Sequence, residues 1–127
     1  MFDAKGIDLT EYEAESSFHD ATGAGRGYGC AGGVAEAIEK CINEYYPDVN
    51  VNIEHAEGLA ECKKILTLAK AGRMNGCLIE GMGCPGGCIA GAGTNIPIVK
   101  AKKNLATFVK NSTKAVPPKE LEEIELK

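Results

Sequence analysis

Apolar residues recur along the chain at two different spacings, which divide it into predicted helices and strands. Residues 34–45, 58–71 and 97–110 place apolar side chains three or four positions apart, the spacing of an amphipathic helix. Residues 49–54 alternate apolar and polar side chains, which is typical of a half-buried strand. A short apolar run predicts a second strand over residues 76–80.

Strand 49–54, helix 58–71 and strand 76–80 follow one another as a βαβ unit. The two strands of such a unit are parallel and its crossover is right-handed. We therefore predict an α/β fold, a small parallel sheet built on this unit with flanking helices. Ligand sites in such sheets lie beyond the carboxyl ends of the strands, so the segment after residue 80 is the first place to look for chemistry.

The two ends of the chain differ from this central pattern. Residues 1–22 are polar and acidic, and we expect an extended arm there with at most one short strand. Residues 23–110 form the predicted α/β lobe. Residues 111–127 form a tail rich in lysine and glutamate, with a weak helical pattern up to Ile124. The length of 127 residues is that of a single domain.

Composition and charge argue against several classes of protein. No apolar run approaches the roughly 20 residues of a membrane span, and residues 1–6 lack the basic and apolar regions of a signal peptide. Residues 1–60 carry twelve acidic side chains and three basic ones, which argues against a nucleic-acid module. We expect a cytoplasmic protein that binds neither membrane nor nucleic acid. Its six cysteines are then reduced thiols or metal ligands rather than disulfides.

Twelve of the sixteen glycines fall in two clusters, at residues 23–33 and 81–93. Glycine costs chain entropy, and this density is typical of backbone that turns sharply or approaches another group closely. The second cluster carries Cys84 and Cys88 directly after a predicted strand. Thiolates on such a loop can converge on one soft metal centre, with backbone N–H groups facing the sulfurs. The alternative is two small cysteines that line the core at a tight turn.

Two cysteines cannot complete a structural zinc site or a cubane iron–sulfur cluster, which use four protein ligands. Cys41 and Cys62 occupy core-facing helical positions and Cys77 lies in a strand, so we interpret these three as small hydrophobic residues. The role of Cys30, in the first glycine cluster, stays open. We therefore expect the other ligands on another chain or segment. The loop at 83–93 has one large apolar side chain, and we expect it to be loose without metal.

The first glycine cluster also matches the GxGxxG pattern of dinucleotide sites over residues 27–32, and Glu54 ends a strand about 20 residues later. That fingerprint requires an apolar strand before the first glycine, and residues 16–22 are not apolar. Dinucleotide binding is therefore only an alternative, and not the interpretation that we prefer. We favour a turn that packs closely against the helix start and directs N–H groups toward an anionic partner. Glu80 is interpreted as a carboxylate that binds loop amides.

The cysteine loop resembles the third cysteine motif in the C-terminal part of the active-site domain of di-iron (iron-only) hydrogenases. That motif reads Glu-x-Met-x-Cys-x-x-Gly-Cys-x-x-Gly. Its residues in this chain are Glu80, Met82, Cys84, Gly87, Cys88 and Gly91. Residues 23–37 resemble the glycine-rich turn and Gly-Gly-Val-x-Glu-Ala helix start of the same domain, and the Glu57-Gly58-Leu59 step also fits. The resemblance covers residues 7–110.

The resemblance implies a role for each matching residue. Cys84 would ligate the 4Fe–4S cubane of the active-site cluster, and Cys88 would ligate the same cubane and bridge it to the di-iron subsite. Met82 would pack near that subsite, and Gly87 and Gly91 would line the bound cluster. The chain would then be the cluster-binding lobe of a hydrogenase that reduces protons reversibly. It would exchange electrons with a ferredoxin-like carrier.

The sequence departs from the family in two respects. The first two cysteine motifs, which supply the remaining cubane ligands, are absent, so the N-terminal part of the active-site domain is the implied partner. We expect no cluster on the isolated chain, whether it is an excised fragment or a split subunit. The Gly-Arg-Gly-Tyr-Gly turn at residues 25–29 replaces an Ile-Phe-Gly version, which suggests a divergent subgroup. The alternative function is a non-enzymatic iron–sulfur or metal-binding module, such as a sensor or scaffold.

Overall fold

The computed structural model describes residues 1–15 and 21–120. In chain order the elements are α1 (Phe2–Lys5), the 3-10 helix η1 (Leu9–Glu11), α2 (Gly23–Arg26), the 3-10 helix η2 (Gly27–Gly29), α3 (Gly33–Tyr45), β1 (Asn52–Glu57), α4 (Leu59–Lys70), β2 (Cys77–Met82), the 3-10 helix η3 (Cys88–Ala90) and α5 (Ile98–Lys110). The helical pattern expected up to Ile124 lies outside the described residues. None of the helices in the described ranges is both long enough and apolar enough to cross a membrane.

The centre of the fold is the predicted βαβ unit. Strands β1 and β2 pair in parallel, with Asn52 opposite Cys77 and Glu57 opposite Met82. Helix α4 connects them and ends at Lys70, and Gly72, with a φ of 74°, lets the chain turn away two residues later. The predicted α/β class, a small parallel sheet with flanking helices, is confirmed.

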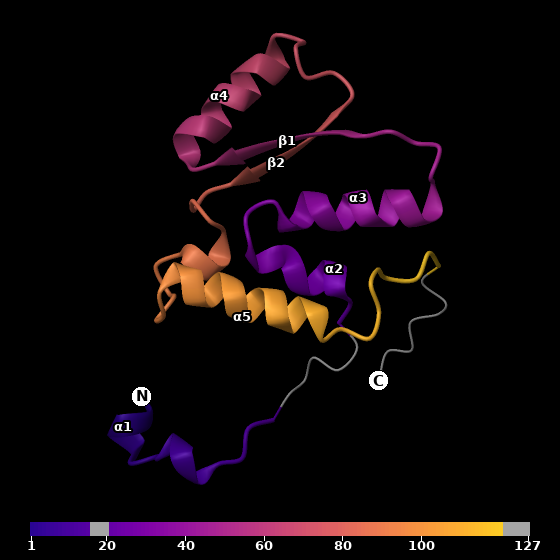
Figure 1. Ribbon diagram of the computed structural model, residues 1–127. Coiled ribbons are helices and arrows are strands. Elements are labelled where there is room, and N and C mark those ends of the chain that lie inside the picture. Colours follow the sequence, from indigo (N-terminus) through magenta and orange to yellow (C-terminus); the bar gives the residue numbers. More distant parts are fainter. Residues whose placement is uncertain (16–20, 121–127) are drawn as a thin grey trace.

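The elements form layers around this sheet, as Figure 1 shows. Helix α4 covers one face and packs on both strands, while α3 lies on the other face against β2. Helices α2 and α5 form a further layer beyond α3, and α2 contacts both of its neighbours. The segment of residues 1–15 is drawn apart from these layers.

The strand boundaries differ from the predicted ones. β1 begins at Asn52 rather than at residue 49, because Val49 donates its N–H to the carbonyl of Tyr46 and so belongs to the turn after α3. β2 continues to Met82, two residues further than predicted. A Cβ at Gly81 would lie 3.3 Å from the Sγ of Cys62, so the absence of a side chain there lets α4 approach the strand closely.

One further expectation was wrong about local structure. Residues 1–15 are not an extended arm, because they contain α1 and η1. The Asp8 carboxylate accepts hydrogen bonds from the hydroxyl and N–H of Thr10 at the start of η1, and these bonds lower the pKa of Asp8. Part of the first glycine cluster is also helical, since Thr22 caps α2 by accepting the N–H of Gly25.

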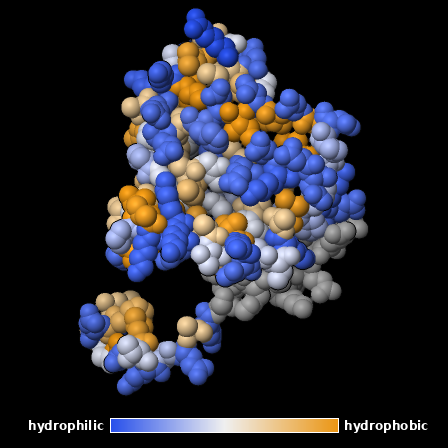
Figure 2. Space-filling view, in the orientation of Figure 1, coloured by the Kyte–Doolittle hydropathy of each residue, from blue (hydrophilic) through white to orange (hydrophobic). Residues whose placement is uncertain are grey.

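The core contains mostly small side chains. The buried apolar residues are Ala24, Ala35, Ala37, Ala56, Ile65 and Ala101. On α4, Leu59 and Leu66 lie about 100–120° around the helix from Ile65, and they are 78% and 62% exposed. Val99 on α5 is 82% exposed. Hydrophobic patches accordingly interrupt the hydrophilic surface on the face shown in Figure 2.

Small residues also allow close contact between backbones. A Cβ on Gly33 would lie only 2.0 Å from the carbonyl oxygen of Gly27. The start of α3 is therefore pressed directly onto η2, and no other residue type fits at position 33 without moving the backbone.

We predict that Gly33→Ala lowers the free energy of unfolding by about 2–4 kcal/mol, because its methyl group meets backbone that cannot rotate away. Urea unfolding followed by circular dichroism measures the change. The control is Gly83→Ala, since nothing lies within 4 Å of a Cβ at that position. Its effect should be within about 0.5 kcal/mol of zero. Equal losses in the two variants would contradict the packing argument.

Candidate metal centre

The two cysteines of the second glycine cluster are the accessible thiols among the described residues. We call residues 83–93 the cysteine loop; it follows directly on the end of β2. Cys84 and Cys88 are exposed, whereas the other four cysteines are half-buried. Exposure leaves both sulfurs free to meet a ligand brought by another part of a larger protein.

The cysteine loop is held in shape by its own backbone. The N–H of Gly87 donates to the carbonyl of Cys84 at 3.0 Å, and the N–H of Gly91 donates to the carbonyl of Cys88 at 3.2 Å. Thr94 closes the loop, with its N–H on the carbonyl of Gly91 and its hydroxyl on that of Cys88. Each thiol therefore sits on a separate small turn.

The cysteine loop also packs against residues 27–33, which we call the glycine turn. The N–H of Ala31 donates to the carbonyl of Gly86 at 3.2 Å. Gly87 is buried there with a φ of 85°, and a Cβ on it would lie 2.4 Å from the nitrogen of Ala31. The cysteine loop thus makes defined backbone contacts with the glycine turn, and its looseness without metal stays a prediction.

The structure brings only some of the predicted site residues close to one another. Cys84, Gly87, Cys88 and Gly91 share the cysteine loop, and a Cβ on Gly91 would lie 3.8 Å from the Sγ of Cys84. Met82, by contrast, borders a cavity of about 300 Å³ between α3 and β2, which neither cysteine lines. The described structure therefore brings the two thiols and two glycines together, and leaves Met82 on a neighbouring surface.

Two of the remaining cysteines, Cys62 and Cys77, contact polar groups of the sheet. The Sγ of Cys62 lies 3.7 Å from the carbonyl oxygen of Ala56 and 3.8 Å from that of Met82, across the ends of both strands. Cys77 accepts a hydrogen bond from the side chain of Asn52. Within residues 1–15 and 21–120, no three histidine, cysteine or acidic side chains are close enough to hold a metal ion. Cys30 therefore does not form a three-residue site with the two exposed thiols.

Glu80 is the buried charged residue of the described structure, with 9% of its surface exposed. One carboxylate oxygen accepts the N–H of Gly32 at 3.1 Å and the other accepts that of Ala35 at 3.0 Å. Its second oxygen also lies 3.6 Å from the Nδ1 of His55. The carboxylate thus binds the amides at the start of α3, which have no partner within the helix. We expected Glu80 to bind amides, and it binds that of Gly32, in the first glycine cluster, and that of Ala35, in the first turn of α3.

The same contact rules out the dinucleotide interpretation. A dinucleotide site places its phosphates on the free amides at the start of the helix, and Glu80 already occupies those of Gly32 and Ala35. A strand must also precede the first glycine of the fingerprint, and helix α2 precedes Gly27 instead.

A second carboxylate near the thiols was missed in the sequence. Glu57, the last residue of β1, accepts the N–H of Gly86 through its Oε2 at 2.7 Å. The available signal was the parallel pairing itself, because the carboxyl ends of parallel strands meet at one edge of the sheet. The last residue of one strand is therefore a neighbour of the loop that follows the other.

Comparison with known families supports the resemblance drawn from the motifs. A family model described as the C-terminal domain of the iron-only hydrogenase large subunit matches residues 1–92. The match spans the glycine turn, the sheet and the whole cysteine motif through Gly91. The chain belongs to this hydrogenase family. None of the curated proteins matches it. Iron-only hydrogenases are enzymes with an iron–sulfur active-site cluster, and the family description implies an N-terminal part of the large subunit as a partner.

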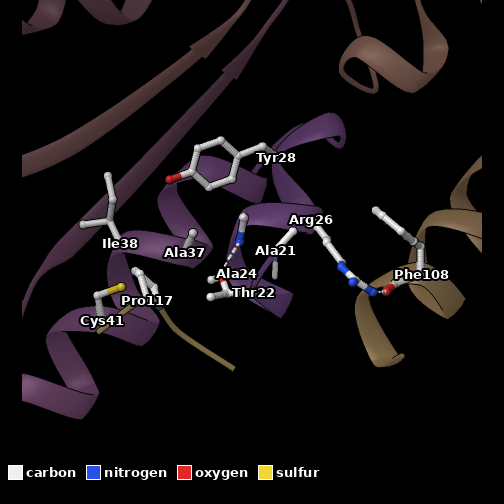
Figure 3. Close-up of a pocket in the computed structure, with 11 residues that line it drawn as sticks. Ala21, Thr22, Ala24, Arg26, Tyr28, Ala37, Ile38, Cys41, Phe108 and Pro117 are labelled. Atoms are coloured by element: carbon white, nitrogen blue, oxygen red, sulfur yellow. Dashed lines mark hydrogen bonds between the residues drawn. The ribbon is translucent and has the colours of Figure 1, made fainter. Parts of the chain in front are cut away.

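A further cavity, of about 600 Å³, is lined by Arg26. This arginine belongs to the Gly-Arg-Gly-Tyr-Gly segment at residues 25–29, which differs from the family's version. In Figure 3 the guanidinium of Arg26 reaches Phe108 of α5, donating to its carbonyl oxygen at 3.0 Å. The guanidinium also stacks 4.3 Å from the centre of the Phe108 ring. No residue of the cysteine loop lines this cavity, so we assign Arg26 to joining α2 and α5 rather than to the metal centre.

We predict that Glu80→Gln destabilises the chain by about 1–3 kcal/mol, because the amide oxygen can replace one of two charge-assisted bonds and its NH₂ group meets another donor. Thermal unfolding at neutral pH measures the loss. Glu39→Gln, on the exposed side of α3, is the matched control and should be nearly neutral. If Glu80→Gln is as stable as the unmodified chain, the bonds from Glu80 to the N–H groups of Gly32 and Ala35 do not stabilise the fold.

Proposed function

We propose that this chain is the C-terminal lobe of an iron-only hydrogenase that supplies two thiolate ligands, from Cys84 and Cys88, to the active-site cluster. The observation that carries the proposal is the pair of exposed thiols on a glycine loop whose backbone is already fixed. The family match covers the same segment. Two soft sulfur donors beside small glycines suit part of the ligand set of a 4Fe–4S cubane, and the rest must come from elsewhere.

The two cysteines take different roles in this proposal. Cys84 would ligate the cubane, and Cys88 would ligate the cubane and link it to a di-iron subsite. Gly91 keeps the space beside the Sγ of Cys84 clear of a side chain, and Gly87 lets the loop that carries both thiols pack against the glycine turn. When bound, the linked cluster supplies the electrons and the iron site for reversible reduction of protons to hydrogen. Met82, which borders the cavity between α3 and β2, would pack near that subsite.

The N-terminal part of the active-site domain is the proposed partner for the remaining ligands. The exposed apolar side chains on α4 and α5, among them Leu59, Leu66 and Val99, are suited to contact with another protein segment. We further propose that residues 1–127 act as a single domain, with the cluster-binding lobe at 23–110 flanked by the acidic segment 1–22 and the tail 111–127. A ferredoxin-like carrier exchanges electrons with the complete enzyme in the cytoplasm.

We predict that the isolated chain does not retain a stable cubane, because two thiolates leave half of its ligand positions unfilled. Anaerobic reconstitution with iron and sulfide, followed by desalting and elemental analysis, measures the bound iron. About four irons per chain after desalting would instead favour a non-enzymatic iron–sulfur module.

We also predict different outcomes for two cysteine substitutions in the complete hydrogenase. Cys88→Ala should abolish hydrogen evolution, because it removes the link between the two subsites. Cys62→Ala should mainly cost stability, roughly 1 kcal/mol, because its sulfur packs between the strand ends. The hydrogen evolution of the two variants is compared at matched folded fraction. Activity retained by Cys88→Ala would contradict the bridging role.

A further inference from the structure

The middle of the cysteine loop is held from two sides. Gly86, between the two thiols, receives the N–H of Ala31 on its carbonyl oxygen and gives its own N–H to the carboxylate of Glu57 at 2.7 Å. Its φ of 86° is a conformation that favours glycine. The placement of Gly86 therefore depends on one backbone contact, at the peptide that follows it, and on one side chain, at the peptide that precedes it.

Glu57 is itself well placed to act as that anchor. Its N–H donates to the Oε2 of Glu61 at 3.0 Å, and the N–H of the next residue, Gly58, donates to the carbonyl of Met82 at 2.8 Å. The backbone that carries the Glu57 side chain is thus tied both to the start of α4 and to the end of β2. A carboxylate held in this way can fix the loop relative to the sheet.

We propose that Glu57 is a positioning residue for the metal centre, which sets the relative placement of Cys84 and Cys88 by binding the N–H of Gly86. This inference rests on the proposed function, because it takes these two thiols as the ligands. Glu57 contacts neither sulfur in any described hydrogen bond, so it acts through the peptide between them. Losing the bond allows Gly86 to rotate and the two turns of the loop to separate.

The test measures the affinity of the 127-residue chain for Cd²⁺, a metal ion that prefers thiolate ligands. Binding is monitored by the near-ultraviolet sulfur-to-cadmium absorption. Glu57→Ala should weaken Cd²⁺ binding about five- to tenfold. Glu57→Gln should stay within about twofold of the unmodified chain, because its side-chain oxygen can still accept the N–H of Gly86. Circular dichroism establishes that each variant is folded.

The matched control is Glu54→Ala, which removes the same charge from the same strand and should leave Cd²⁺ affinity within about twofold. Equal losses in Glu57→Gln and Glu57→Ala would show that charge rather than position matters, and would overturn the proposal. So would unchanged affinity in Glu57→Ala, or an equal loss in Glu54→Ala.

Two more variants separate this inference from the proposed function. Cys84→Ser should abolish most of the sulfur-to-cadmium absorption; if it does not, the ligand assignment fails first. If Glu57→Ala does not fold, Glu57→Asp replaces it, because it keeps the charge but shortens the side chain by one methylene. Its affinity should fall similarly, and an unchanged affinity would overturn the positioning role.

Discussion

The cysteine loop depends on direct contact between two stretches of glycine backbone. Gly33 lies against the carbonyl of Gly27, and Gly87 lies against the nitrogen of Ala31, so α3, the glycine turn and the cysteine loop are stacked in series. A side chain at either glycine would separate these segments. Much of the glycine content therefore serves internal packing. The exposed thiols are carried on a backbone that these contacts hold in place.

Two carboxylates from neighbouring strands stabilise this stack. Glu80, from β2, binds amides at the start of α3, and Glu57, from β1, binds an amide of the cysteine loop. Helix starts and tight turns leave N–H groups without backbone partners, and a carboxylate satisfies them with charge-assisted bonds. The sheet thus holds the glycine turn and the cysteine loop through two of its own side chains. The amides at the start of α3, which resemble an anion-binding site, are bound by Glu80 instead.

The thin core is consistent with a chain that belongs to a larger hydrogenase subunit. Ile65 is the one large apolar side chain that is buried among the described residues, while Leu59, Leu66 and Val99 remain largely exposed. A small domain gains most of its stability by removing such side chains from water. Contact with the N-terminal part of the subunit would supply both burial for these residues and the ligands that the cluster requires.

The sequence by itself determined the βαβ unit, the three long helices and the cysteine motif, because periodic apolar spacing and local motif chemistry act over a few neighbouring residues. It also indicated the hydrogenase family through Cys84, Cys88 and the residues around them. It did not reveal that Glu57 holds Gly86, that Glu80 fills the helix start, or that Met82 borders a separate cavity. Those contacts join residues 29 to 48 positions apart or depend on which face of a strand is covered. Only tertiary packing decided them, because local patterns carry no information about which distant donor and acceptor will meet.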